Sequence, residues 1–258
     1  MTEHQPRNAL VTGAARRIGR AIALDLAGSG WGVAIHYHGS HDEALATVAE
    51  IEAAGGRAAA VRADLLCEAE TGGLIAEASA LIGPLTCLVN NASQFERDTA
   101  ETATRESWDL HMETNLRAPF VLMQDFARAL CAAKPDDMTG CVINLIDERV
   151  WNLTPHFVSY TLSKSALWTL TRTLALAFAP RIRVNAVGPG PTLPSPRQDD
   201  RQFARQSKAT PLGRSIAPEE ICDAVRFILA APSMTGQMIA LDGGQHLGWR
   251  NTGDDPDE

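Results

Sequence analysis

Short apolar runs alternate with longer amphipathic segments along the chain, and this alternation restricts the fold more than any other feature. The apolar runs lie at residues 9–11, 33–35, 58–61, 87–89, 141–146, 182–187 and 238–241. Segments with helical spacing lie between them, at residues 18–26, 42–54, 68–81, 105–131, 160–178 and 219–229. Strands joined by helices form right-handed crossovers and a mostly parallel sheet with helices on both faces. The sequence therefore predicts an α/β fold with seven strands.

The chain shows no linker that would divide it. Its 258 residues, 45% of them hydrophobic, suit one large domain, which we expect to span residues 1–250. Residues 251–258 contain four acidic residues and are expected to form a disordered acidic tail. Residues 188–217 lack periodicity and contain five prolines, which makes the stretch too long for an ordinary connection. We expect its central part, about 191–214, to be a lid over the substrate.

Charge and cysteine content exclude several classes of protein. A net charge of −8 does not favour a nucleic-acid surface. Five scattered cysteines without a CxxC motif argue against a disulfide framework and against a zinc site. The N-terminus lacks the apolar stretch of a secretion signal, and no run approaches the ~18 apolar residues of a membrane span. We expect a cytoplasmic protein that binds no metal, nucleic acid or membrane.

The first predicted strand leads through a glycine-containing turn into the first helix. The backbone N–H groups and the dipole of a helix start favour an anion there. Glycine at position 13 permits a tight turn, and glycine at position 19 permits close packing of helix against sheet. The residues expected to bind a dinucleotide in this turn are Gly13, Arg16, Arg17, Ile18 and Gly19.

The end of the second predicted strand indicates which dinucleotide is bound. A carboxylate at this place binds the ribose 2′-hydroxyl of NAD, whereas basic groups accept the additional phosphate of NADP. Here the chain has His36, Tyr37, His38 and Ser40, with no acid among them. The serine hydroxyl, the start of the next helix and an arginine of the first turn can together bind a phosphate. The sequence therefore predicts NADPH as the cofactor.

Tyr160 and Lys164 stand four residues apart, which places both side chains on one face of a helix. A neighbouring ammonium favours the phenolate, so we expect Lys164 to lower the pKa of Tyr160 from ~10 toward neutrality. A phenol of that kind can exchange a proton with a substrate. The lysine can also reach the hydroxyls of a ribose.

Taken together, these motifs and several others resemble the short-chain dehydrogenase/reductase family over essentially the whole length of the chain. The matching motifs are Thr12-Gly13 with Gly19, Asn90-Asn91-Ala92, Asn115, Tyr160 with Lys164, Asn185, Pro189-Gly190 and Asp242-Gly243-Gly244. The resemblance implies a single-domain, doubly wound Rossmann-type parallel sheet of seven strands. It also implies a nicotinamide cofactor, a small-molecule substrate and a homotetramer.

The resemblance further implies roles for individual residues. Asn90 would line the adenosine side of the cofactor cleft, and Asp64 would contact adenine. Asn115 would hold a water of the proton relay. The remaining residues expected around the cofactor are Leu65, Asn91, Ala92, Ser93, Lys164, Pro189 and Gly190.

Two departures from the family pattern are informative. Arg17 stands where most members carry a third glycine, and Asp147 stands thirteen residues before the tyrosine, where most carry a catalytic serine. Together with Ser93, Phe95 and His36-Tyr37-His38, these departures resemble the pteridine reductases. In that subfamily the arginine contacts cofactor phosphate and pterin, the phenylalanine stacks on the pterin, and the aspartate joins the tyrosine in proton delivery. The subfamily's usual basic residue is absent at Gly39.

The predicted chemistry is reasonable in itself. Reduction of a C=N bond requires a proton on a ring nitrogen, which a carboxyl at Asp147 can donate directly or pass to Tyr160. A flat pterin would stack on Phe95 opposite the nicotinamide. The expected substrate-binding residues are thus Arg17, Ser93, Phe95, Asp147 and Tyr160, and the catalytic ones are Tyr160, Lys164, Asp147 and Asn115.

Other interpretations stay open at the level of sequence. Asp147 can instead cap a helix or pair with Arg149, and Phe95 can be a core residue. The protein can be a carbonyl reductase, such as a 3-oxoacyl carrier-protein reductase, or a non-catalytic NADP-sensing module. The lid has no readable code that would distinguish biopterin, dihydromonapterin and dihydrofolate.

Overall fold

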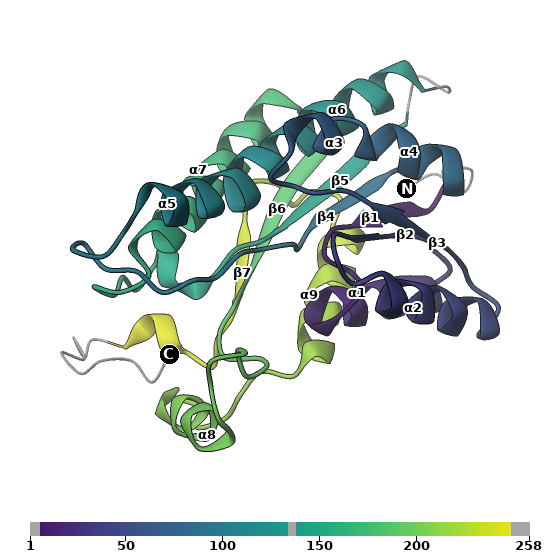
Figure 1. The fold of residues 1–258 in the computed structure, drawn as a ribbon. Helices are drawn as coiled ribbons and strands as arrows, with labels where there is room; N and C mark the ends of the chain where they lie inside the picture. The colour runs from purple at the N-terminus through teal and green to yellow at the C-terminus, as the bar shows by residue number, and fades with distance from the viewer. Residues whose placement is uncertain (1–5, 134–137, 249–258) are drawn as a thin grey trace.

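A computed structural model describes residues 6–133 and 138–248. Within these residues, seven parallel strands form one sheet in the order β3-β2-β1-β4-β5-β6-β7 (Figure 1). The strands are β1 (Asn8–Val11), β2 (Gly32–Tyr37), β3 (Arg57–Arg62), β4 (Cys87–Asn90), β5 (Gly140–Leu145), β6 (Ile182–Pro189) and β7 (Met238–Leu241). The predicted seven-stranded, doubly wound α/β sheet is confirmed.

Helices cover both faces of the sheet (Figure 1). One face carries α1 (Arg17–Gly28), α2 (His41–Ala53) and α9 (Pro218–Ala230). The other carries α3 (Glu68–Thr71), α4 (Leu74–Ile82), α5 (Arg105–Met112), α6 (Ala118–Ala132) and α7 (Val158–Ala177). Each layer buries its own apolar cluster, around Ile22 and Val225 on the first face and around Phe126 and Leu167 on the second. Burial on both faces explains why the strands read as continuous apolar runs.

Two of the predicted helices are interrupted. The segment predicted as one helix at 68–81 forms α3 and α4, separated by Gly72 and Gly73, because glycine weakens a helix interior. The segment at 105–131 forms α5, a π-helical turn η1 (Glu113–Arg117) and α6. Pro119 has no N–H for the carbonyl four residues earlier, which disturbs the regular helix at this place.

The segment that the sequence analysis describes as aperiodic contains a helix, α8 (Asp200–Ala209). The Asp199 side chain accepts a hydrogen bond from Gln202 N, and the Gln202 side chain accepts one from Asp199 N, which forms a capping box. The expectation of an irregular stretch is wrong here, because the D-x-x-Q signal was not considered. In Figure 1 α8 lies apart from both helix layers. The predicted tail at 251–258 lies outside the described residues.

The strand order positions a cleft. The chain runs from β1 outward to β3 and then crosses to β4, so the connections after β1 and β4 leave the sheet in opposite directions. A crevice forms at the carboxyl ends of strands where this happens. The loops after β1, β4, β5 and β6 all reach this edge, together with two short 3₁₀ turns, η2 (Glu148–Val150) and η3 (Gln245–Leu247). None of the helices in residues 6–133 and 138–248 combines the length and apolar character needed to cross a membrane.

Candidate active site

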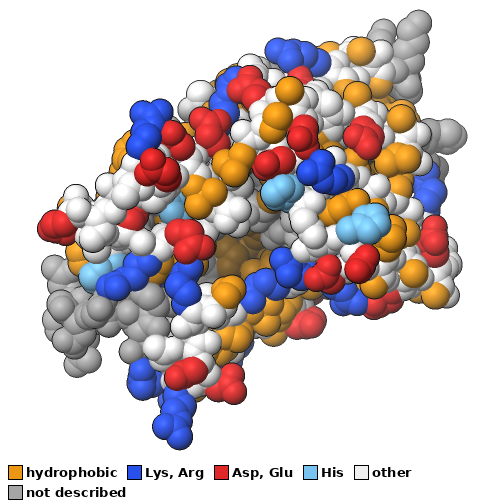
Figure 2. Space-filling model, viewed as in Figure 1, with side chains coloured by type: hydrophobic (Ala, Val, Ile, Leu, Met, Phe, Trp, Pro, Cys, Tyr) orange, Lys and Arg blue, Asp and Glu red, His pale blue; other side chains and the backbone are white. Residues whose placement is uncertain are grey.

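Two adjoining cavities open along this edge, and Figure 2 shows a hollow with an apolar floor there, with arginine or lysine side chains on its rim. The glycine-loop cavity, of about 740 Å³, lies over the first turn and the end of β2. The tyrosine cavity, of about 250 Å³, lies over Tyr160. Predicted cofactor residues that line the first are Gly13, Arg16, Arg17, Ile18, His36, Tyr37, His38, Ser40, Asp64, Leu65, Asn91, Ala92 and Ser93. Predicted residues that line the second are Arg17, Ile18, Asn91, Ser93, Phe95, Asp147, Tyr160, Lys164, Pro189 and Gly190.

The first turn needs glycine at two positions. Gly13 has φ +63°, and a Cβ there would lie 3.1 Å from Ala92 Cα. A Cβ on Gly19 would lie only 2.4 Å from the Gly13 carbonyl oxygen. The turn is therefore closely packed, and its backbone is exposed to the glycine-loop cavity at Gly13. Such a cradle at a helix start fits a pyrophosphate.

His36 supports the turn from below. Its Nδ1 accepts a hydrogen bond of 3.0 Å from Gly13 N, and its Nε2 lies 3.1 Å from the Ala63 carbonyl oxygen. Burial lowers the pKa of His36 to about 4, so the ring is neutral and Nε2 donates. Both ring nitrogens thus bind the protein. His36 thus supports the loop and also lines the glycine-loop cavity, where its predicted contact with the cofactor stays a prediction.

The rim of this cavity is polar and largely exposed. The Arg16 guanidinium lies 3.7 Å from the Glu43 carboxylate, and His38 Nε2 lies 3.7 Å from the Asp64 carboxylate. Ser40 is the N-cap of α2, but its hydroxyl does not cap the helix. These basic and hydroxyl groups surround the end of β2, where the strand itself supplies no carboxylate.

The two asparagines at the end of β4 differ in their positions. Asn90 is buried, and its Nδ2 donates a 2.8 Å hydrogen bond to Asn144 Oδ1 on β5. It lines neither of these two cavities, and its predicted place beside adenosine stays a prediction. Asn91 lines both cavities, but its side chain donates to Thr12 O at 2.8 Å and so ties the two loops together.

Arg17 adopts the left-handed backbone conformation, with φ +56°. Glycine adopts this region without cost, which explains why glycine is the usual residue here. The guanidinium donates to the carbonyl oxygens of Pro194, at 2.8 Å, and Leu193, at 3.2 Å, both in the lid. Arg17 also lines both cavities, where its predicted contacts to phosphate and pterin stay a prediction.

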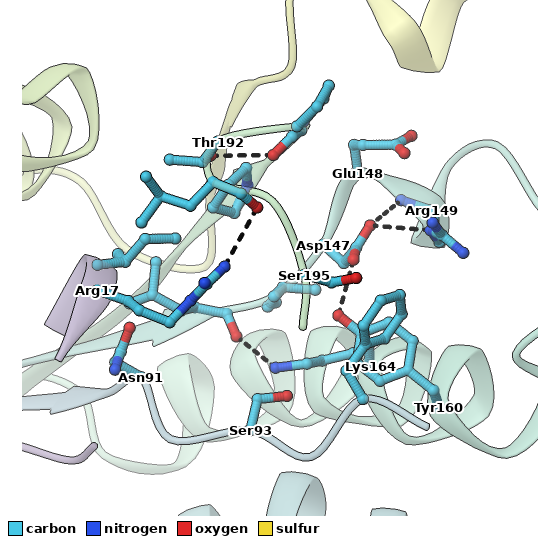
Figure 3. A pocket seen from close by; sticks show the side chains of 18 of the residues that line it. Arg17, Asn91, Ser93, Asp147, Glu148, Arg149, Tyr160, Lys164, Thr192 and Ser195 are labelled. Atoms are coloured by element: carbon cyan, nitrogen blue, oxygen red, sulfur yellow. Dashed lines mark hydrogen bonds and ion pairs between the residues drawn. The ribbon is translucent and has the colours of Figure 1, made fainter. Parts of the chain in front are cut away.

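Tyr160 and Asp147 are directly bonded. The tyrosine hydroxyl donates a 2.7 Å hydrogen bond to Asp147 Oδ2 (Figure 3). The other carboxylate oxygen, Oδ1, accepts from Arg149 N at 2.9 Å and lies 3.9 Å from Arg149 Nε. The helix-cap and ion-pair interpretations of Asp147 therefore hold for one oxygen, and the other oxygen binds the candidate proton donor.

The pKa of Tyr160 moves opposite to the sequence-based expectation. Burial raises the pKa of the phenol well above its usual range, and the negative charge of Asp147 raises it further. Lys164 is also buried, and its Nζ donates a 2.9 Å hydrogen bond to the Leu145 carbonyl oxygen. Burial lowers the pKa of Lys164 to about 8, against the opposing attraction of Asp147. The lysine thus does not produce the expected acidic phenol.

Glu148 lines the tyrosine cavity, and the sequence analysis missed it. Its side chain is 3% exposed, and Oε2 has no hydrogen-bond partner within the part of the chain that the structure describes. Burial raises the pKa of Glu148 to about 9, and the charge of Asp147 adds to this effect. Only its position next to Asp147 could have drawn attention to it.

Phe95 belongs to an aromatic cluster at the cavity wall. Its ring stacks on Phe157 with centroids 4.5 Å apart, and the Tyr160 ring meets it edge-on at 4.6 Å. The Arg149 and Arg197 guanidinium groups lie 5.3 Å and 5.2 Å from its centroid. Phe95 is thus held in place while it lines the cavity. Phe157, with φ +57°, was not found from sequence, because positive φ is unusual for phenylalanine.

Asn115 serves the loop that carries Phe95. Its Oδ1 accepts from Gln94 N at 2.8 Å, and its Nδ2 donates to Gln94 O at 2.9 Å and to Ser163 Oγ at 3.1 Å. The Ser93 hydroxyl adds a fourth bond, of 3.2 Å, to Oδ1. Both ends of the amide thus anchor the loop, and the predicted role of Asn115 in holding a relay water stays a prediction.

A family model described as Enoyl-(Acyl carrier protein) reductase matches residues 13–246 of this chain. A 3-oxoacyl-[acyl-carrier-protein] reductase FabG of Staphylococcus epidermidis is 33% identical over 247 residues, which cover 93% of this chain and 99% of that protein. A 3beta-hydroxysteroid dehydrogenase 1 of Eggerthella lenta is 32% identical over 248 residues, covering 93% of this chain and 94% of that protein.

Two solved structures share more of the sequence. The FolM alternative dihydrofolate reductase 1 of Brucella canis, complexed with NADP, is 51% identical, with a TM-score of 0.90 over 95% of this chain and 96% of that chain. The corresponding Brucella suis protein with NADP is 51% identical, with a TM-score of 0.91 over 98% of this chain and 99% of that chain.

Proposed function

The chain belongs to the short-chain dehydrogenase/reductase family, and from that premise we propose that it is an NADPH-dependent reductase that transfers a hydride to a C=N bond of a pteridine of the dihydropterin or dihydrofolate type. The observation that carries the proposal is the hydrogen bond between Tyr160 and Asp147. A carboxylate stands where carbonyl reductases of the family carry a serine. The 51% identity to the two Brucella proteins supports the same assignment.

The glycine-loop cavity fits NADPH. The turn at Gly13 presents backbone to the cavity at a helix start, and no carboxylate of β2 is placed to bind a 2′-hydroxyl. Arg16, His38 and Ser40 line the rim where the 2′-phosphate would lie. NADPH supplies the hydride when it is bound.

Tyr160 delivers the proton that the reduction requires. Its hydroxyl gives a proton to the ring nitrogen as hydride reaches the neighbouring carbon, so C=N becomes CH–NH. The phenolate then recovers a proton through Asp147 Oδ2, which already accepts the hydroxyl hydrogen bond. The Lys164 ammonium, 5.8 Å from the tyrosine ring centroid, stabilises the transient phenolate.

The wall of the tyrosine cavity suits a flat heterocycle. Phe95 supplies an aromatic ring whose position is fixed by Phe157, and Ser93 and Arg17 supply polar groups at the junction of the two cavities. We further propose a homotetramer as the assembly, on the family pattern alone.

A second candidate is reduction of a carbonyl group, as in a 3-oxoacyl carrier-protein reductase. The 33% identity to the Staphylococcus epidermidis protein favours it. Asp147 argues against it, because a carboxylate repels the developing alkoxide that a serine hydroxyl would stabilise. The bonded Tyr160–Asp147 pair beside Lys164 also argues against a module without catalysis.

A substrate panel tests the proposal. NADPH oxidation is measured with dihydrobiopterin, dihydromonapterin, dihydrofolate, folate and an acetoacetyl thioester, and with Tyr160→Phe as the inactive control. We expect kcat/KM to be highest with one of the pteridines. Efficient reduction of the thioester without turnover of any pteridine would establish the carbonyl reductase instead.

A further inference from the structure

Residues 193–197, termed the strap, contribute Leu193 and Ser195 to the wall of the tyrosine cavity and are held from both sides. On one side, Arg17 donates hydrogen bonds to the carbonyl oxygens of Leu193 and Pro194. On the other side, Arg197 donates to the Phe95 carbonyl oxygen at 2.6 Å and to the Glu96 carboxylate at 2.7 Å. These bonds join segments about a hundred or more residues apart in sequence, so the closed strap is a product of the tertiary fold.

Ser195 lies between the two clamps. Its side chain is 8% exposed and lines the same cavity as Asp147 and Tyr160. Figure 3 shows its hydroxyl pointing into the cavity, on the side of that pair. Within the described chain this hydroxyl has no hydrogen-bond partner. The backbone N–H of Ser195, in contrast, donates to Gln198 Oε1 at 3.1 Å.

The strap is built to keep this residue in place. Gln198, which accepts the Ser195 N–H, donates from its own Nε2 to Gln206 Oε1 on α8 at 2.8 Å. The backbone of Ser195 is thus tied to the lid helix, while the hydroxyl alone lacks a partner. A buried hydroxyl without a partner destabilises a fold, so its presence in a clamped strap points to a ligand.

We propose that Ser195 is a substrate-binding residue, whose hydroxyl donates a hydrogen bond to the pteridine beside the C=N bond that is reduced. A pteridine has two reducible ring nitrogens, and each lies beside a second hydrogen-bond acceptor. One nitrogen lies beside the ring carbonyl oxygen, and the other lies beside a nitrogen of the pyrimidine ring. A hydroxyl placed near Tyr160 can bind such an acceptor while the tyrosine serves the nitrogen. Ser195 thereby returns a hydroxyl to a site that has Asp147 in place of the family's serine. The inference rests on the proposed function.

This arrangement makes Arg197 a positioning residue. Ser195 reaches the substrate only when the strap is closed, and Arg197 closes it onto the loop that carries Phe95. Binding of the pteridine and closure of the strap are therefore coupled through one short segment.

The first test compares Ser195→Ala with Ser207→Ala. Ser207 is equally buried in the lid, but its hydroxyl already donates to the Phe203 carbonyl oxygen within α8. Ser195→Ala should lower kcat/KM for the preferred pteridine about tenfold, which corresponds to one lost hydrogen bond. NADPH affinity should stay unchanged, and Tm should be equal or higher, because an unpartnered buried group is removed. Ser207→Ala should leave kcat/KM nearly unchanged.

The outcomes separate the two proposals. Unimpaired pteridine turnover by Ser195→Ala overturns the role of Ser195 and leaves the proposed function standing. A loss accompanied by a lower Tm indicates a structural role and also overturns it. A wild-type protein that binds NADPH but reduces no pteridine overturns the proposed function itself, and the inference with it.

The second test addresses the clamp. Arg197→Met should raise KM for the pteridine several-fold with little change in kcat, whereas Glu96→Gln keeps the bond from Arg197 to Phe95 and serves as the matched control.

A double variant tests the coupling. Because Ser195 and Arg197 both act through the closed strap, Ser195→Ala combined with Arg197→Met should reduce kcat/KM no more than the worse single variant does. Losses that multiply would show that the two residues act independently, which contradicts the coupling.

Discussion

At the scale of single residues, Asp147 combines a structural contact with a contact to the proposed proton donor. Oδ1 caps the η2 turn through Arg149 N, and Oδ2 binds the Tyr160 hydroxyl. A serine at this position has one oxygen and cannot serve both partners in the same way. We therefore expect replacement of Asp147 to have a structural and a catalytic consequence, which have to be measured separately.

Asp147→Asn tests the catalytic part. The amide keeps the shape and an acceptor for Arg149 N, but it cannot carry a proton between solvent and Tyr160. We expect kcat for a dihydropteridine to fall by about a hundredfold or more, with KM little changed. Steady-state kinetics measure this, and thermal unfolding of the same variant controls for loss of structure. Unchanged pteridine turnover would remove Asp147 from the relay.

Glu148 provides a prediction about pH. Burial raises its pKa from 4.5 to about 9, so the folded protein keeps it neutral while the unfolded chain ionises. Folding is therefore not penalised by ionisation of Glu148 below about pH 4.5, and the free energy of unfolding falls as the pH rises from there toward about 9. Glu148→Gln removes the ionisable group. The difference in the free energy of unfolding between this variant and the wild type should therefore be about 1–3 kcal/mol more favourable to the variant at pH 8 than at pH 5.

Urea unfolding of the wild type and of Glu148→Gln at several pH values measures this effect. Replacement of the exposed Glu52 by glutamine is a suitable control, because that side chain lies on the surface of α2. Parallel pH profiles for the wild type and Glu148→Gln would contradict the prediction.

At the scale of secondary-structure elements, two helices begin next to strained residues. Arg17 opens α1 with φ +56°, and Phe157 precedes α7 with φ +57°. Non-glycine residues in this region cost on the order of 1 kcal/mol each. Both side chains reach the site, Arg17 at the junction of the cavities and Phe157 behind Phe95. The strain therefore accompanies positioning of the functional groups.

We expect the end of β2 to determine which dinucleotide is preferred. Gly39 lines the glycine-loop cavity, and a Cβ at this position would meet no atom within 4 Å. Gly39→Asp should therefore fold normally and place a carboxylate beside the ribose. We expect the ratio of kcat/KM for NADPH to that for NADH to fall at least tenfold, because the carboxylate repels the 2′-phosphate and accepts from a 2′-hydroxyl. A wild-type preference for NADH would contradict this interpretation of β2.

At the scale of the whole molecule, the site joins parts that the sheet holds together. The glycine-loop cavity is lined by the loops after β1, β2, β3 and β4, and the tyrosine cavity adds those after β5 and β6. A ligand that bridges these loops binds only the folded chain, so it stabilises the protein as a whole.

NADPH should accordingly raise Tm. At a hundred times its Kd the expected stabilisation is about 2.7 kcal/mol, and NADH at the same concentration should stabilise less. Differential scanning fluorimetry measures both shifts. Tyr160→Phe should show the same NADPH shift as the wild type, since the hydroxyl acts on the substrate. Equal shifts with both cofactors would contradict the predicted preference.

The sequence by itself determined the sheet, its helices, the glycine turn and the spacing of Tyr160 and Lys164. These features depend on local periodicity and on the conformations open to glycine, which can be read from neighbouring residues. It also indicated Arg17 and Asp147, through their departure from a family pattern, and Phe95, through its resemblance to the pteridine reductases. The interruption of the helix at Gly72 and Gly73 was readable too, had the two glycines been weighed against the apolar spacing.

Only the tertiary structure decided how these groups act on one another. The direction of the Tyr160 pKa shift depends on burial and on Asp147, and the sequence analysis considered only Lys164. Arg17 binds the lid, a segment far from it in the chain. The burial of Glu148 and the position of Ser195 between two clamps likewise depend on segments far apart in the chain. Distance and desolvation govern such interactions, and both are set by packing of the complete fold rather than by residue spacing.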